Sequence, residues 1–253
     1  MIRLDRHPWR EVRAAGERGA IAVLPVGSQE QHSEHLPMGT DTMLAEAVVD
    51  AASDLIGDDG PELVRLPALP YGHSPHHLFA AAVSLSATTL LAVLDDALDS
   101  LVRSGFRRVL LVNGHGGNDE VVRLAVKTYA ERADVALGAC SYWTIAGPED
   151  PPQAPGHAGW FETSLLLAVH PDLVRPAGPW REPEAPPLFH RPPAPGLTVA
   201  RHGEWARVGG VTDDAGTADP EAGERLLAGR ARALAAAIRA FDSATATSHG
   251  HQR

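Results

Sequence analysis

The stretch from residue 108 to residue 118 reads Arg-Val-Leu-Leu-Val-Asn-Gly-His-Gly-Gly-Asn. Its first half is a short apolar run, which is typical of a strand buried on both faces. Its second half is a glycine-rich turn, and apolar residues follow at helical spacing: Val122, Ala125, Val126 and Tyr129. The stretch therefore predicts a strand, a tight turn and a helix, in that order.

The same unit recurs on both sides of this stretch. An apolar run at 21–26 precedes a helix that should have Thr40 or Asp41 as its N-cap and end at Gly57. Further strands are expected at 62–69 and 135–141, and further helices at 90–105, 159–170 and 220–240. Strands that alternate with helices favour an α/β fold whose mostly parallel sheet is covered on both faces. The sequence shows no internal repeat and no boundary, so we expect residues 1–253 to form a single domain.

The composition limits the class of protein. Of the 253 residues, 44% are hydrophobic and 21% are charged, which allows a large core and excludes a disordered or fibrous chain. The net charge of −10 and the lack of a Lys/Arg block argue against nucleic acid as a partner. No apolar run is long enough for a membrane helix, the N-terminus lacks the apolar region of a secretion signal, and Cys140 is the single cysteine. We therefore expect a soluble, cytoplasmic protein.

Side chains that can bind metals gather just after the expected strands. Glu30 and His32 follow the first strand two residues apart, a spacing that directs both side chains to one side of an extended segment. Asp41 lies further along, His115 lies in the glycine-rich turn, and Glu162 lies where a later helix begins. Loops at the carboxyl ends of parallel strands share one edge of the sheet, so these five residues should converge. Taken singly, each also fits a polar surface loop or an acidic helix N-terminus.

The number of candidate ligands favours two ions over one. If Asp41 bridges, the five residues make six contacts, three to each ion, and a shared water completes four-coordination. Histidine and carboxylate ligands without a thiolate favour zinc or manganese over a soft metal. Such a centre can activate water for attack on an amide carbonyl. Metal-dependent amide hydrolysis is therefore the first functional hypothesis.

Two other functions stay open at this point. Residues 114–117 could hold a phosphate group or a nucleotide in a non-catalytic domain. Gly114 and Gly116 match the first two glycines of the dinucleotide-binding fingerprint, but Asp119 stands at its sixth position and no Gly-Lys-Ser/Thr follows. The other possibility is a scaffold that has lost its activity and works as an assembly subunit, which would bind metal without turnover.

Other polar residues receive weaker predictions. Residues 72–77 follow the second strand and could line the pocket, with His73 or Ser74 touching a substrate. His76 and His77 fit a solvated turn or a subunit contact equally well. Cys140 fits a small core residue better than a nucleophile. Five further histidines are expected at the surface: His170, His190, His202, His249 and His251.

Taken together, the motifs resemble those of the creatininase family. The resemblance rests on Leu24-Pro-Val-Gly-Ser-Gln-Glu-Gln-His32, His35-Leu-Pro, Thr40-Asp41, Asn113-Gly-His-Gly-Gly-Asn118, Ser141-Tyr-Trp143 and His157-Ala-Gly-Trp-Phe-Glu-Thr-Ser164. It implies a three-layer α/β/α fold, a binuclear zinc or manganese centre, hydrolysis of cyclic or linear amides, and often a homohexamer.

The resemblance also implies roles for single residues. The metal ligands would be Glu30, His32, Asp41, His115 and Glu162. His157 would be the nearby acid/base, with Glu162 as the second catalytic residue, and Trp143 looks like the family's substrate-covering tryptophan. The other candidate substrate contacts are His73, Ser74 and Gly116.

The glycine-rich turn differs within the family. Members that open creatinine carry Tyr-Glu where this chain has Gly116-Gly117, so Glu162 is expected to supply the missing carboxylate. The Gly-His-Gly-Gly-Asn form is shared by members that trim the mycofactocin precursor peptide and by others that deformylate pyrimidine intermediates. The resemblance therefore implies the class of reaction and leaves the choice of amide open.

Overall fold

A computed structural model describes residues 1–145 and 155–246. Its sheet has five strands in the order β1-β3-β2-β4-β5, and every neighbouring pair is parallel. The strands are β1 (Ile2–Arg3), β2 (Ile21–Val26), β3 (Leu63–Arg65), β4 (Arg108–Asn113) and β5 (Ala136–Ser141). The two long central strands, β2 and β4, are buried along their whole length because helices cover both faces of the sheet.

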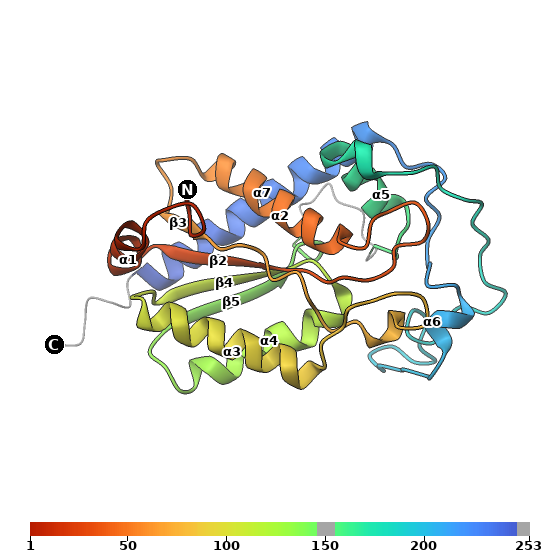
Figure 1. The fold of residues 1–253 in the computed structure, drawn as a ribbon, viewed down its shortest axis with the longest axis horizontal. Coiled ribbons are helices and arrows are strands. Elements are labelled where there is room, and N and C mark those ends of the chain that lie inside the picture. The colour runs from red at the N-terminus through yellow and green to blue at the C-terminus, as the bar shows by residue number, and fades with distance from the viewer. Residues whose placement is uncertain (146–154, 247–253) are drawn as a thin grey trace.

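Helices form a layer on each side of this sheet (Figure 1). One face carries α2 (Thr40–Ile56), α5 (Trp160–Val169) and α7 (Pro220–Thr245), and the other carries α3 (Ala87–Arg103) and α4 (Asp119–Ala130). Helix α1 (Trp9–Glu17) contributes to the core on the α3 side, and α6 (Glu204–Arg207) is a short helix beyond the sheet. The expected three-layer α/β/α architecture is confirmed.

The protein has two hydrophobic cores, one on each face of the sheet, and the side chains of the central strands alternate between them. In β2, Ile21 and Val23 pack toward α2 and α7, whereas Ala22 and Leu24 pack toward α3. Successive side chains of a strand point to opposite faces, so an uninterrupted apolar run satisfies both cores at once. None of the helices in the described part of the chain has the length and apolar character needed to cross a membrane.

The segments after β2 and β4 approach each other at the carboxyl edge of the sheet. Residues 27–39 connect β2 to α2, and His115 follows β4 by two residues. The carboxyl ends of the strands point toward the side of the molecule on which α5 and α6 lie (Figure 1). At this edge Gly114 passes so close to α2 that a Cβ there would lie 2.3 Å from the carbonyl oxygen of Asp41. Glycine is therefore required where the turn meets the helix.

Candidate metal centre

Asp41 lies between two histidines at the start of α2. Its Oδ1 is 3.2 Å from Nε2 of His32, and its Oδ2 is 3.2 Å from Nδ1 of His115. The Asp41 residue is only 2% exposed, so it holds a carboxylate away from water. One buried carboxylate thus faces two nitrogen atoms that come from segments far apart in the sequence.

Two sets of three candidate ligands share this carboxylate. One set is Glu30, Asp41 and His115, and the other is His32, Asp41 and Glu162. Within each set the ligand atoms lie within 4.8 Å of one another. The structure therefore brings together all five residues that the sequence singled out, and it gives Asp41 the shared position expected of it.

Hydrogen bonds fix which ring nitrogen of each histidine faces the centre. The Nε2–H of His115 donates to the carbonyl oxygen of His73 at 3.1 Å, which leaves Nδ1 facing Glu30 and Asp41. The Nδ1–H of His32 donates to the carbonyl oxygen of Glu30 at 3.1 Å, which leaves Nε2 toward Asp41 and Glu162. Metal-binding histidines are commonly oriented in this way, with the second ring nitrogen donating outward.

Buried oxygen atoms without partners also fit a metal centre. Neither Oε1 of Glu30 nor Oδ2 of Asp41 has a hydrogen-bond partner among the described residues, although both are shielded from solvent. A buried carboxylate oxygen left in this state costs free energy unless a cation or a donor balances it. The donor set of imidazole nitrogens and carboxylate oxygens suits Zn²⁺ and Mn²⁺.

The charged groups of the centre compensate one another. Burial lowers the pKa of His32, but the carboxylates of Asp41, Glu162 and Glu30 together outweigh burial and raise that pKa to about 10. Burial also lowers the pKa of His115, but the Glu30 and Asp41 carboxylates hold that pKa well above its usual value. Burial raises the pKa of the Glu162 carboxyl group to about 7. Protons on the histidines balance the carboxylates here, and divalent cations can take over that balance by displacing the protons.

Asn113, the last residue of β4, shapes the turn that carries His115. Its side-chain oxygen accepts from the backbone N–H of His115 at 3.0 Å, and its Nδ2 donates to the carbonyl oxygen of His115 at 2.7 Å. Nδ2 also donates to Oγ of Ser141 on β5 at 2.9 Å. The asparagine thereby fixes the backbone on both sides of the imidazole and ties it to the neighbouring strand.

His157 and Glu162 reach the centre from the segment that leads into α5. The Nε2–H of His157 donates to the carbonyl oxygen of Gln31 at 2.8 Å, and its Nδ1 lies 3.6 Å from Oε1 of Glu30. Oε2 of Glu162 accepts from the backbone N–H of Ala158 at 2.7 Å. Glu30, His32 and His157 also form a set whose ligand atoms lie within 4.8 Å of one another. His157 therefore lies directly beside two of the candidate metal ligands.

The four candidate substrate contacts lie in different surroundings. Ser74 is fully buried, and its hydroxyl donates a very short hydrogen bond to Oε2 of Glu30. The imidazole of His73 donates from Nδ1 to the carbonyl oxygen of Leu85 at 3.0 Å. Trp143 packs edge-on against Tyr142 beside the core on the α2 side. A Cβ built at Gly116 meets no atom within 4 Å, so this position borders open space.

Two further residues lie beside the centre: His77, which sequence reasoning left open between the pocket, a turn and a subunit contact, and Trp205, which it missed. His77 is fully buried in a short 3-10 helix, η1 (Pro75–His77), rather than in a solvated turn, and its Nε2 lies 3.5 Å from Oε1 of Glu30. Trp205 of α6 packs on η1, with ring centroids 4.9 Å from His76 and 4.8 Å from His77. The paired histidines after a strand were the available signal for His77, whereas a lone tryptophan in a proline-rich stretch gave none.

Among the described residues, Cys140 and the further histidines expected at the surface belong to none of the candidate ligand sets. His170, His190 and His202 are exposed, as predicted, and His249 and His251 lie outside the described residues. Cys140 is on β5 beside the core, where burial raises the pKa of its thiol to about 12. A thiol with such a pKa stays protonated and is a poor nucleophile.

The two glycines after His115 are not equivalent. A Cβ at Gly117 would lie 2.3 Å from the carbonyl oxygen of His73 and 2.5 Å from Nε2 of His115. No side chain fits there without moving the backbone that accepts the hydrogen bond from His115. Position 117 thus has no room for a carboxylate, whereas Glu162 already lies in one of the ligand sets.

We expect Gly117→Ala to weaken metal binding by about 10- to 100-fold, the usual cost of disturbing a hydrogen bond that orients a ligand. Gly116→Ala is the matched control, because the added methyl group meets nothing and should leave metal affinity unchanged. Equilibrium dialysis against buffered Zn²⁺ measures both. A Gly117→Ala protein that binds Zn²⁺ like the wild type would show that the His73 contact does not orient His115.

Solved structures with the same fold share about a third of the sequence. A crystal structure of creatinine amidohydrolase (creatininase) superimposes with a TM-score of 0.76 at 32% identity, covering 94% of this chain and 96% of the other. A structure described as creatininase Mn gives a TM-score of 0.72 at 30% identity, with coverage of 94% and 98%. A mutant creatininase described as the Zn-Zn type gives 0.75 at 32% identity, with coverage of 94% and 97%.

Sequence relatives carry two kinds of name. Creatinine amidohydrolase of Pseudomonas putida is 33% identical over an alignment of 258 positions, which covers 91% of this chain and 94% of the relative. Mycofactocin precursor peptide peptidase of Mycobacterium tuberculosis, strain H37Rv, is 36% identical over 240 residues, which span 87% and 89%. The family profile described as creatinine amidohydrolase matches residues 5–238. Fold, sequence and the grouping of buried ligands agree, and the chain is a hydrolase of the creatininase family.

Proposed function

We propose that the protein is a metal-dependent amidohydrolase that cleaves the carbon–nitrogen bond of a small cyclic or linear amide with a metal-activated water molecule. The observation that carries the proposal is the pair of three-residue ligand sets that share Asp41. Relatives described with manganese and as a Zn-Zn type support two divalent ions, zinc or manganese, as the cofactors.

The proposed ligands divide between the two ions. Glu30 and His115 would hold one ion, and His32 and Glu162 the other, with one oxygen of Asp41 turned toward each. The support for this division is the direction of the ring nitrogens: Nδ1 of His115 and Nε2 of His32 are the two that do not donate to backbone carbonyls.

When bound, the ions would lower the pKa of a water ligand toward about 7 and polarise the amide carbonyl. His157 is placed to move the proton, because Nε2 is engaged by the carbonyl of Gln31 and Nδ1 remains free toward the centre. In this mechanism Nδ1 takes a proton from the attacking water as its oxygen bonds to the carbonyl carbon. The same nitrogen then gives the proton to the amide nitrogen as the carbon–nitrogen bond breaks, so that a neutral amine and a carboxylic acid leave, and the acid then releases its proton to solvent.

A peptide is the second candidate substrate. The observation that favours it is the open space beside Gly116, where the absence of a side chain leaves room for a longer chain near His115. The peptidase relative is as similar in sequence as the creatinine amidohydrolase. The chemistry at the metal centre would be the same for both substrates, and the difference would lie in what surrounds it.

Hydrolysis assays with and without a chelator test the proposal. Protein loaded with Zn²⁺ or Mn²⁺ should hydrolyse at least one member of a panel that contains creatinine, linear ureido and formamido compounds, and mycofactocin precursor peptides. Chelation should abolish the activity, and the same metal should restore it. Cleavage of the peptides alone would favour the second candidate. Metal-loaded protein that hydrolyses none of them, or activity that survives chelation, would contradict the proposal.

A further inference from the structure

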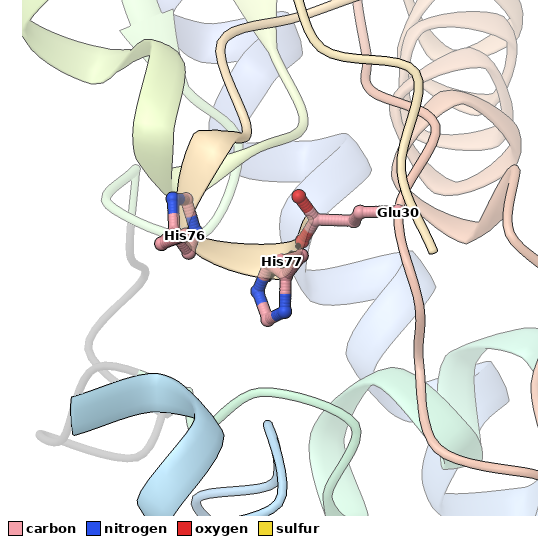
Figure 2. Close-up of side chains that lie close together, drawn as sticks. All are labelled: Glu30, His76 and His77. Carbon is pink, nitrogen blue, oxygen red and sulfur yellow. Dashed lines mark ion pairs between the residues drawn. The ribbon is translucent and has the colours of Figure 1, made fainter. Parts of the chain in front are cut away.

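His77 is a buried histidine that the proposed ligand sets do not use. It points from η1 toward the carboxylate of Glu30, which reaches it from the segment after β2 (Figure 2). The two side chains meet because backbone hydrogen bonds hold the loop that carries η1 beside that segment: Val83 N–H donates to Gln29 O at 2.9 Å, and Gln31 N–H donates to Ala81 O at 2.9 Å. His77 is therefore a fixed neighbour of Glu30.

Gln31 determines the protonation of the His77 ring. The backbone N–H of Ser33 donates to Oε1 of Gln31 at 2.8 Å, which identifies the other end of this amide as the nitrogen. That nitrogen donates to the carbonyl oxygen of Gly210 at 2.9 Å and to Nδ1 of His77 at 2.8 Å. Nδ1 of His77 must therefore offer a lone pair, and a neutral imidazole in that state carries its hydrogen on Nε2.

The hydrogen on Nε2 faces a carboxylate oxygen that needs a donor. Nε2 of His77 and Oε1 of Glu30 are 3.5 Å apart, and among the described residues neither atom has a hydrogen-bond partner. Both side chains are fully buried, so solvent does not satisfy them. A protonated Nε2 cannot bind a metal ion, although Glu30, His76 and His77 lie close enough together to form a ligand set.

The other oxygen of Glu30 is held from the opposite direction. Oε2 accepts from the hydroxyl of Ser74 and lies 3.3 Å from Nδ1 of His115. An oxygen with two lone pairs can accept one hydrogen bond and still bind a cation. The orientation of this carboxylate is thus set at both ends, with Oε2 directed to the proposed ion.

We propose that His77 is a positioning residue, whose Nε2–H donates to Oε1 of Glu30 and thereby directs Oε2 of Glu30 to the metal ion shared with Asp41 and His115. This role rests on the binuclear centre of the proposed function. It extends that centre by a chain that runs from Gly210 through Gln31 and His77 to Glu30. Trp205 of α6 packs edge-on against His77. The helix α6 therefore helps, through His77, to hold Glu30 in place.

Three variants separate a donor role from simple packing. His77→Leu removes the N–H and keeps an apolar side chain, His77→Gln keeps an N–H that can reach Glu30, and His76→Gln makes the same change on the neighbouring residue. Each metal-free protein is titrated with Zn²⁺ by equilibrium dialysis, and its unfolding temperature is measured without metal. We expect His77→Leu to weaken one of two sites by about 10- to 100-fold. His77→Gln should recover most of that affinity, and His76→Gln should bind like the wild type.

The outcomes that would overturn the role are distinct. Wild-type affinity in His77→Leu, or equal losses in His77→Leu and His77→Gln, would show that the N–H does not matter. A third Zn²⁺ in the wild type that is lost in both His77→Gln and His76→Gln would make these histidines ligands. If the His77→Leu protein is unfolded without metal, the comparison of His77→Gln with His76→Gln decides. A large loss of Zn²⁺ affinity in His77→Gln alone would then contradict the role. A wild type that binds no metal would refute the proposed function itself.

Discussion

Replacing Asp41 with alanine is expected to remove both metal ions. Asp41 is the one residue common to the two ligand sets, and its two oxygens lie 3.2 Å from His32 on one side and 3.2 Å from His115 on the other. Without it each ion would keep two protein ligands, one fewer than zinc sites of this kind use. The metal content should fall from about two ions per chain to near zero, and hydrolysis should fall to the level of chelated protein.

Asp54→Ala is the matched control, because Asp54 is an exposed aspartate on the same helix. It should keep both ions and full activity. Elemental analysis of the purified variants, together with far-ultraviolet circular dichroism to check folding, gives the comparison. If Asp41→Ala retained one ion at full occupancy, Asp41 would not be the bridge.

His157→Gln is expected to keep both ions and lose catalytic rate. Glutamine can donate to the carbonyl of Gln31 as Nε2 of His157 does, but it has no nitrogen that takes up a proton at neutral pH. A positioned general acid/base contributes about 10²- to 10⁴-fold, so kcat should fall by roughly that factor. The measurement is steady-state kinetics on a substrate found in the amide panel, with metal content determined on the same samples.

Glu162→Gln is the contrasting variant, because Glu162 belongs to a ligand set with His32 and Asp41. It should lose metal as well as rate. His157 also lies in a set with Glu30 and His32, so metal loss in His157→Gln would move it into the ligand group. Full activity of His157→Gln would instead reduce it to a structural residue near the start of α5.

The central strands were predictable because an uninterrupted apolar run indicates a strand buried on both faces. The uninterrupted apolar runs of β2 and β4 match the structure, and α2 ends just before Gly57, as predicted. The predicted N-cap was wrong: Gly39 rather than Thr40 or Asp41 precedes the helix, and no side chain caps it.

The strand expected at 62–69 is shorter, Leu63–Arg65, because beyond Arg65 the pairing with β2 continues only as an isolated bridge between Leu69 and Val26. The strand β1 and the helices α1 and α6 were missed: two and four residues are too few to show a period in β1 and α6, and α1 buries only Val12, Ala15 and Gly16.

The convergence of the candidate ligands was predictable from topology. Glu30 and His115 follow two strands that are neighbours in the sheet, and the carboxyl ends of parallel strands share an edge. The count of ligands also showed that a shared Asp41 would give each ion three protein contacts. The placement of Asp41 between His32 and His115 depends on the approach of Gly114 to α2, a contact that periodicity does not encode.

The residues that orient the ligands were harder to foresee. Ser74 was a candidate substrate contact, and in the structure its hydroxyl donates to Glu30. His77 was left open between the pocket, a solvated turn and a subunit contact, and it is fully buried. Both lie in a segment without regular hydrophobic spacing, whose position is set by backbone hydrogen bonds to residues 29 and 31. Such long-range pairing between loops leaves no local pattern in the sequence.

The metal content of the wild-type protein tests the central claim most directly. Protein purified without chelator and then dialysed against excess Zn²⁺ or Mn²⁺ should contain about two ions per chain, because the five buried ligands divide into two sets of three that share Asp41. Elemental analysis against an accurate protein concentration measures the ratio. Two ions per chain is the result that this account predicts, and a reproducible value near zero would contradict it.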